Sequence, residues 1–214
     1  MFDGAGDYIE VGDKTNLESM SHLTLEVWIY YRTFDNTGNY ESVIGKYSRF
    51  GLLNENLGYM LYIQELDALP FFSVSDDGLN GDLLVFKNNL TNNRWYHLVA
   101  IYNGTRLRGY INGVLDNSSA TVEATGTIIN TSDSVRVGSN SVGDGNNYDF
   151  TGLIDEVAIY NRSFTDAEVY QLYASNLYKF NQSQWYLYVN QSKNTSSGLD
   201  QGNYTYFTSA KNTT

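Results

Sequence analysis

Cysteine is absent from this chain of 214 residues, and proline occurs only once. Without cysteine, neither disulfides nor thiolate metal sites can form, and two histidines alone disfavour a zinc site. Basic residues number only 13 against 24 acidic ones, so the formal charge is −11. Such a balance opposes binding to a nucleic-acid backbone, which needs clustered lysine and arginine. There is also no apolar run of 18 residues for a membrane span, and MFDGAGDYIE is not typical of a signal peptide.

Aromatic residues and glycine are plentiful instead. The chain holds 19 Tyr, 10 Phe, 3 Trp and 19 Gly. This composition favours strands joined by tight turns, and the length suits one main domain.

Several segments carry strand patterns. Residues 23–32, LTLEVWIYYR, alternate, so Leu23, Leu25, Val27 and Ile29 should share a core-facing side. Residues 93–115 contain two Asn-Gly pairs, at 103–104 and 112–113, which predict two hairpins. Shorter β-type runs follow the first strand at 58–76 and 82–88 and the hairpins at 133–139 and 153–160. Many short strands with short turns indicate a sandwich or a barrel.

A single short helix is predicted after the last of these strands. Thr165 and Glu168 match the Thr-x-x-Glu capping box, and Val169, Leu172 and Tyr173 recur at helical spacing. The helix should therefore lie on a sheet with one apolar side.

An ordered set of these segments resembles a known family. FDGAGDYIEVGD, LTLEVWIYYRTF, NRWYHLVAIYNGTRLRGYINGVLD, VRVGS and FTGLIDEVAIYNRSFTDAEVYQLY look, in that order, like the laminin G-like jelly roll of the concanavalin A-like superfamily. The resemblance implies an all-β fold, a two-sheet antiparallel jelly-roll sandwich with one short C-terminal helix. It also implies a concave face or a rim of loops that binds sugars or protein partners.

The resemblance further implies a structural calcium ion. Its ligands would be Asp3, Gly4 and Asp155, the positions that match those of relatives. Period two places Asp155 beside Leu153, Val157 and Ile159, so we expect a buried carboxylate that needs either a cation or several N–H donors.

A second candidate site is the polar loop SVGDGNNYDF. Its oxygen-bearing side chains and one aromatic ring could hold calcium or a sugar, although the same residue types fill ordinary exposed turns. The candidate ligand-binding residues are Asp144, Asn146, Asn147, Tyr148 and Asp149. Trp28 and Tyr30, on the other side of the first long strand, are further candidates, with packing as the alternative for Trp28.

The composition changes near residue 178. We expect a laminin G-like domain at 1–177 and a Tyr-rich tail of two strands at 178–214. The tail is similar to the start of an immunoglobulin-like module of microbial, specifically archaeal, surface proteins. Its two strands cannot bury a core by themselves, so they either pack on the first domain, begin a second one or pair with another subunit.

Asn-x-Ser/Thr sequences occur ten times, against about four expected by chance. This excess favours N-glycosylation, and with it an extracellular location at the cell surface. The alternative is that Asn, Ser and Thr simply gather in loops. The acceptors are Asn89, Asn103, Asn117, Asn130, Asn161, Asn181, Asn190, Asn194, Asn203 and Asn212.

Three classes of function remain to be weighed. Glycosidases with this jelly roll carry Glu-x-Asp-x-x-Glu on one strand, which this chain lacks, and no nucleophile triad is evident, so we expect no enzyme. The leading interpretation is a non-catalytic adhesion module that binds glycans or cell-surface proteins. The alternative is a structural subunit of a surface layer, stalk or filament that self-assembles through its C-terminal strands.

Overall fold

The computed structural model describes residues 1–32, 40–50, 54–79, 81–118, 126–140, 148–179 and 185–189. The chain divides into two compact units, Met1–Tyr173 and Ala174–Thr214. The predicted boundary between residues 177 and 178 falls a few residues later than this division.

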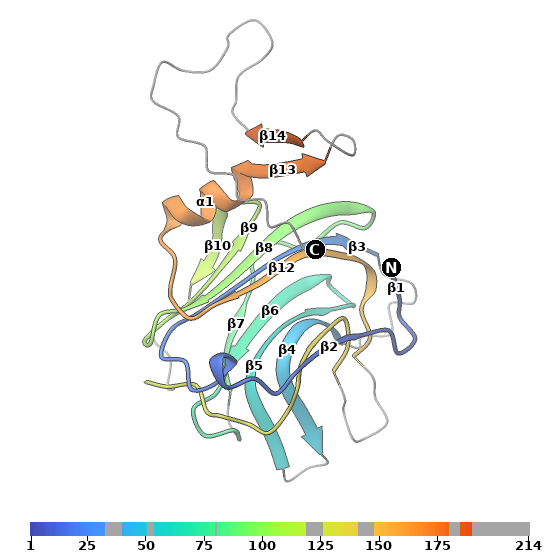
Figure 1. The fold of residues 1–214 in the computed structure, drawn as a ribbon. Helices are drawn as coiled ribbons and strands as arrows, with labels where there is room; N and C mark the ends of the chain where they lie inside the picture. The colour runs from blue at the N-terminus through green and yellow to red at the C-terminus, as the bar shows by residue number, and fades with distance from the viewer. Residues whose placement is uncertain are drawn as a thin grey trace, which may run out of the picture. The chain divides into compact units, whose positions relative to one another are not determined.

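The first unit is a sandwich of two antiparallel sheets, which confirms the predicted all-β jelly roll (Figure 1). Sheet A has the order β1 (Phe2–Asp3), β12 (Thr151–Tyr160), β3 (Leu23–Tyr31), β8 (Arg94–Tyr102), β9 (Leu107–Ile111) and β10 (Val114–Ser118). Sheet B has the order β2 (Ile9–Gly12), β11 (Val135–Val137), β4 (Tyr40–Phe50), β5 (Asn54–Gln64), β6 (Leu69–Val74) and β7 (Asp82–Val85). A single 3-10 turn, Thr15–Leu17, precedes β3.

The core lies between the two sheets. The predicted alternation of β3 is confirmed, because its four aliphatic side chains at positions 23, 25, 27 and 29 are fully buried. Leu98 of sheet A and Leu61 and Phe72 of sheet B belong to the same cluster. The opposite side of each strand therefore faces away from the core, and these outer faces are where a site can form.

Both predicted hairpins are present. Asn112 and Gly113, with φ of 52° and 77°, form the two-residue turn between β9 and β10. The other Asn-Gly pair lies in a four-residue loop, 103–106, where the Asn103 side chain accepts hydrogen bonds from the amides of Thr105 and Arg106. By contrast, β4 has no counterpart among the predicted strands, and it pairs with β5 and β11.

The predicted helix is α1 (Asp166–Ala174), and its residues Val169 and Leu172 pack on Val99, Ile101 and Tyr110 of sheet A. It lies on the outer face of this sheet (Figure 1). Val99 and Ile101 point to the outer face, because Leu98 and Ala100, which alternate with them along β8, are in the main core. No helix in the described ranges is long and apolar enough to cross a membrane.

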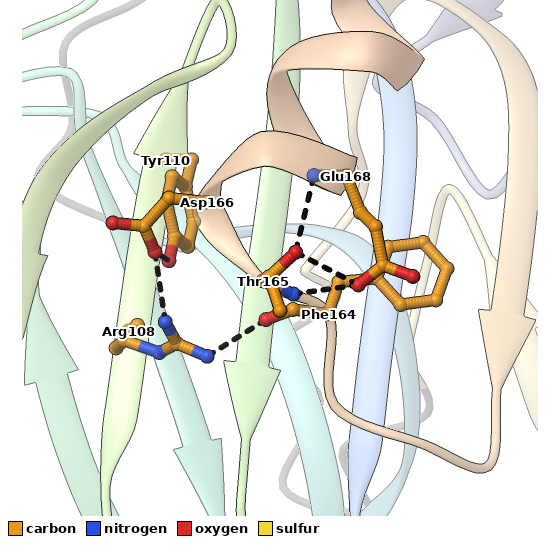
Figure 2. Close-up of polar contacts among 6 residues, drawn as sticks. All are labelled: Arg108, Tyr110, Phe164, Thr165, Asp166 and Glu168. Atoms are coloured by element: carbon orange, nitrogen blue, oxygen red, sulfur yellow. Dashed lines mark hydrogen bonds and ion pairs between the residues drawn. The ribbon is translucent and has the colours of Figure 1, made fainter.

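Polar contacts hold the start of α1 in place (Figure 2). The Thr165 amide donates to Glu168 Oε2 at 2.8 Å, and the Glu168 amide donates to Thr165 Oγ1 at 3.3 Å, so the capping box is confirmed. From β9, Arg108 Nη1 and the Tyr110 hydroxyl donate to Asp166 Oδ1 at 2.9 and 2.7 Å.

A β-bulge in β12 changes which side chains face the core. Asp155 lies opposite Trp28, whereas Ala158 lies opposite Glu26, so β12 has one extra residue between these pairs. Ile154 before the bulge and Ile159 after it both pack against the core. The expectation of a buried Asp155 is therefore wrong: its side chain is exposed, on the face that also carries Trp28.

In the second unit the structure describes two strands, β13 (Ser175–Lys179) and β14 (Trp185–Val189), paired antiparallel. The second Tyr-rich strand predicted for the tail, beyond residue 200, lies outside the described residues.

Candidate functional site

Four aromatic rings gather on the outer face of sheet B. We call Tyr40, Tyr62, Phe71 and Tyr148 the aromatic group. Tyr62 and Phe71 stack with ring centroids 5.3 Å apart and an interplanar angle of 20°. Tyr40 stands edge-on to both Tyr62, at 5.4 Å, and Tyr148, at 5.7 Å. All four side chains are partly exposed, so the group presents ring surface to solvent.

The alternation of β5 and β6 positions two of these rings. Leu61 and Ile63 point into the core, so Tyr62 between them must point outward. Phe71 lies opposite Tyr62 in the β5–β6 register, which explains the stacking. The other two rings come from the start of β4 and from the segment after residues 141–147. There the Tyr148 carbonyl accepts a hydrogen bond from the Ser42 amide at 3.0 Å.

Polar atoms accompany the rings. Ser42 lies opposite Tyr62, and its buried hydroxyl has no hydrogen-bond partner in the described part of the chain. Asn140 is fully buried, and its Nδ2 donates to Met60 Sδ at 2.9 Å. Burial, followed by the neighbouring phenols of Tyr40 and others, raises the pKa of Tyr62, so its hydroxyl stays protonated and can donate to a ligand.

Two neighbouring rows of residues that run across the strands of sheet B at the aromatic group contain no charged side chain. One row runs Ser42–Tyr62–Phe71–Val85 across four strands, and the next runs Gly45–Met60–Ser73–Leu83. Aromatic and apolar surface with a few polar atoms suits a neutral ligand that has both apolar faces and hydroxyl groups.

The three residues proposed to bind calcium do not converge. Asp3 lies opposite Thr151, whereas Asp155 is four residues farther along β12, which corresponds to about 13 Å. One Asp155 carboxylate oxygen instead accepts the Glu156 amide at 2.9 Å. Within the described residues, no three His, Asp or Glu side chains form a group that could hold a metal ion. The predicted set of Asp3, Gly4 and Asp155 therefore does not fit one site, and calcium binding by the chain stays a prediction.

The predicted ligand loop is described only at its end. Tyr148 is a member of the aromatic group. Asp149 turns to the N-terminal segment, where its Oδ2 accepts the Gly6 amide at 2.8 Å. Asp144, Asn146 and Asn147 lie outside the described residues.

Three members of the aromatic group had not been predicted as site residues. The alternation in GYMLYIQ could have predicted that Tyr62 lies on the other face of its strand from the aliphatic side chains. Nothing in the sequence places Tyr40 and Tyr148 side by side, because they are 108 positions apart and come together only at the beginning of β4 in the folded chain.

Trp28 and Tyr30, the other aromatic candidates, have different surroundings. Trp28 stacks on Tyr173 of α1, with centroids 5.8 Å apart, so packing against the helix explains it. Tyr30 contacts Trp95 edge-on at 5.6 Å and is partly exposed. His97 is fully buried beside Trp28.

Five of the ten glycosylation acceptors are described. Asn89, Asn130 and Asn161 are exposed, and Asn103 and Asn117 are partly buried. Asn181, Asn190, Asn194, Asn203 and Asn212 lie outside the described residues.

Comparison with known proteins identifies the class to which this fold belongs. Residues 3–170 match the model of a laminin G-like family described as "Concanavalin A-like lectin/glucanases superfamily". The chain belongs to this family, as its sandwich of two antiparallel sheets also indicates. No curated protein sequence matches the chain significantly.

Solved structures with the same fold include carbohydrate-binding and receptor-binding domains. One is a putative carbohydrate-binding protein from Bacteroides ovatus, with a TM-score of 0.60 and 18% identity; the match covers 79% of this chain and 45% of that one. Another is the CBM40 of the Ruminococcus gnavus IT-sialidase, with a TM-score of 0.66 and 15% identity over 80% of this chain and 95% of that one. A third is a botulinum neurotoxin type C chain, with a TM-score of 0.58 and 16% identity over 80% of this chain and 40% of that one.

The present chain therefore spans less than half the length of the Bacteroides ovatus and botulinum proteins. The CBM40 has also been solved bound to α2,3-sialyllactose, and cell entry of botulinum neurotoxin type C is described as dependent upon interaction with two ganglioside molecules. At these low identities, the similarity shows the fold.

Proposed function

We propose that this chain is a non-catalytic glycan-binding module that serves adhesion in an extracellular, glycosylated surface protein. The observation that carries the proposal is the aromatic group on the outer face of sheet B. The CBM40 and the Bacteroides ovatus protein support it, because both share the fold and are named for carbohydrate binding.

Binding uses the two properties that this face combines. The exposed parts of Tyr62 and Phe71 pack on the apolar C–H face of a sugar ring, as aromatic rings do with flat apolar surfaces. The protonated Tyr62 hydroxyl forms hydrogen bonds with sugar hydroxyls. Since each contact alone is modest, affinity for a single sugar is low, and a polymer or a multivalent surface raises it by avidity.

A glycan array followed by calorimetry tests the proposal. Tyr62→Ala and Phe71→Ala should each weaken binding of the best glycan at least about tenfold, which corresponds to about 1.4 kcal/mol. Tyr170→Ala is the matched control, since this exposed tyrosine lies on α1, against sheet A. If both sheet-B variants bind as the parent protein does, the aromatic group is not the site; if no glycan binds, the proposed function fails.

The proposal includes the absence of catalysis. The sequence has no Glu-x-Asp-x-x-Glu motif. The acidic pair that comes nearest to this motif is Asp155 and Glu156, which are adjacent residues at the β12 bulge. Incubating the pure protein with β-glucans and galactans, followed by reducing-sugar analysis, should detect no hydrolysis. Release of sugar that persists through a second purification step would contradict this part of the proposal.

Assembly through the C-terminal strands is the second candidate function. β13 and β14 form a two-stranded sheet of their own, and two strands alone are marginally stable. A further strand from another subunit would extend such a sheet by main-chain hydrogen bonds. Light scattering on the full chain and on a chain that lacks residues 179–214 separates the two functions. An assembly subunit becomes monomeric on truncation, whereas a glycan-binding module keeps its ligand.

A further inference from the structure

The outer face of sheet A carries a second exposed aromatic surface. Near one end of this sheet Tyr30 and Trp95 lie opposite each other on β3 and β8. Trp95 is 42% exposed, the highest value among the large hydrophobic residues of β3 and β8. The α1 cluster occupies the other end of β8, at Val99 and Ile101, so its packing does not cover these two rings.

Arg32 completes this surface. Its guanidinium carbon lies 5.1 Å from the centre of the Tyr30 ring, and the side chain is partly exposed. The Arg32 Nε is buried without a hydrogen-bond partner in the described ranges, and no ion pair of this side chain occurs there either. The Thr151 carbonyl accepts the Arg32 amide, and Thr151 lies opposite Asp3 of β1, so Asp3 is two strands from Arg32, or about 10 Å. Asp155 is four residues from Thr151 along β12, which corresponds to about 13 Å.

The other arginines that stack on aromatic rings in this protein show what is missing at Arg32. Arg108 lies over Tyr110 and pairs with Asp166 at 2.9 Å. Arg136 lies over Tyr8, 4.7 Å from the ring centre, and pairs with Glu10 at 3.2 Å.

Arg162 follows the same rule, since it lies over Phe164 and pairs with Glu168 at 2.8 Å. Among the described residues, Arg32 is thus the ring-stacked arginine that has no carboxylate. In a chain with a formal charge of −11, an arginine held on a ring and left without an acidic partner is available for an external carboxylate.

We propose that Arg32, Tyr30 and Trp95 form a second binding site, which takes a saccharide bearing a carboxylate. The guanidinium pairs with the carboxylate through two parallel N–H···O bonds, and the exposed Trp95 ring packs on the adjoining sugar ring. A saccharide fits better than an acidic peptide because the guanidinium lies beside a flat, exposed ring system. The inference extends the proposed glycan binding to a second site, on a different sheet from the uncharged aromatic group.

Trigalacturonic acid and its fully methyl-esterified form are suitable probes, because esterification removes the charge of each carboxyl group and adds only a methyl group. NMR titration of the full chain, with the three Trp indole resonances assigned, should show binding of the acid at the Trp95 resonance. The ester should bind at least tenfold more weakly, and higher salt should weaken the acid but not the ester. Equal binding of acid and ester, or no shift of the Trp95 resonance, would overturn the proposal.

Variants separate this site from its surroundings. Arg32→Gln should reduce acid binding at least tenfold, and Arg32→Lys should restore part of it, since lysine keeps the charge without the planar fork. Arg136→Gln is the matched control, because that arginine also lies on a ring but is already paired.

Two further outcomes decide between occupants and between sites. If triglutamate binds at the Trp95 resonance and trigalacturonate does not, the site takes peptides and the saccharide proposal fails. Tyr62→Ala should leave acid binding unchanged. If Arg32→Gln loses binding of the acid but still binds neutral glycans, the second site is supported. If the parent protein binds the acid but no neutral glycan, only the proposed site at the aromatic group is contradicted.

Discussion

His97 Nε2 lies 3.2 Å from Glu26 Oε1, and both residues are buried on the outer side of sheet A, where α1 also packs. The other Glu26 oxygen accepts a hydrogen bond from the Tyr160 hydroxyl at 2.9 Å. A buried carboxylate is thus held at both oxygens, and the histidine that might have indicated catalysis has a structural role in this contact.

Tyr160→Phe should therefore lower the free energy of unfolding by about 1–3 kcal/mol, because it leaves one Glu26 oxygen without its donor. Urea unfolding measures the change. Tyr8→Phe is the control: Tyr8 is half-exposed and its hydroxyl makes no hydrogen bond in the described part, so we expect a change within about 0.5 kcal/mol. Equal effects of the two variants would show that the Glu26 contact contributes nothing.

Gly109→Ala should destabilise the sandwich by steric overlap. A Cβ at this position would lie 2.5 Å from Cζ of Phe86, and overpacking of this kind costs about 1–3 kcal/mol. Phe86→Leu should partly rescue Gly109→Ala in a double-mutant cycle measured by urea unfolding.

The matched control is Gly6→Ala, where a Cβ meets nothing within 4 Å but φ is +83°. Its cost of about 1 kcal/mol arises from the backbone alone, so Phe86→Leu should not rescue it. A rescue of both glycine variants would contradict the steric explanation.

Glu156→Gln should stabilise the protein, and more so as the pH rises. Burial, with repulsion from Asp155 and Glu26, raises the pKa of Glu156 above its ordinary value of 4.5. Because the folded-state pKa exceeds that of the unfolded chain, ionisation disfavours folding. This penalty is absent below the unfolded pKa and complete above the folded one.

Melting temperatures of the two proteins should therefore converge near pH 3 and separate towards pH 7. Glu156 also has a φ of 49° at the bulge, so Glu156→Gly should stabilise by about 1 kcal/mol more, through relief of the left-handed conformation. A constant difference between parent and Glu156→Gln over this pH range would contradict the assigned cause.

The capping box predicts the opposite dependence on pH. The Thr165 amide, followed by Arg162 and the Thr165 hydroxyl, lowers the pKa of Glu168. A lowered folded-state pKa gives stability that is present above the unfolded pKa and is lost as the pH falls through the folded one. Glu168→Gln should therefore destabilise at pH 7 but not at pH 2. Thr165→Ala should cost about 1 kcal/mol at pH 7, as measured by urea unfolding. A Glu168→Gln effect of equal size at both pH values would argue against an ionic contribution.

Glycan occupancy should differ among the acceptor sites. The Asn117 side-chain amide donates to the Val85 carbonyl at 2.7 Å, and that of Asn89 donates to the Asp67 carbonyl. Attachment of a sugar to either nitrogen must displace these bonds, whereas Asn130 and Asn161 are exposed and their side chains make no such contact with the described residues. Glycopeptide mass spectrometry of the native protein should therefore find higher occupancy at Asn130 and Asn161. An intact mass equal to the bare chain would refute glycosylation altogether.

Local patterns predicted much of the fold. The β3 core face, the hairpin at Asn112 and Gly113, and the capping box at Thr165 depend on residues within a few positions of one another, and all three are confirmed. The expectation that Asp155 is buried failed for a reason that the pattern of residues does not show. A single extra residue in β12 reverses the alternation, and a period of two cannot reveal where such a bulge falls.

The order of residues by itself determined which strands have a core side, where the chain turns and where the helix begins, because these depend on alternation and on short-range hydrogen bonds. Only the tertiary structure decided that Tyr40, Tyr62, Phe71 and Tyr148 share one surface. It also decided that Arg32, unlike the other ring-stacked arginines, has no carboxylate partner among the residues that the structure describes. Such neighbours are brought together by strand register and sheet order, which pair residues far apart in the chain.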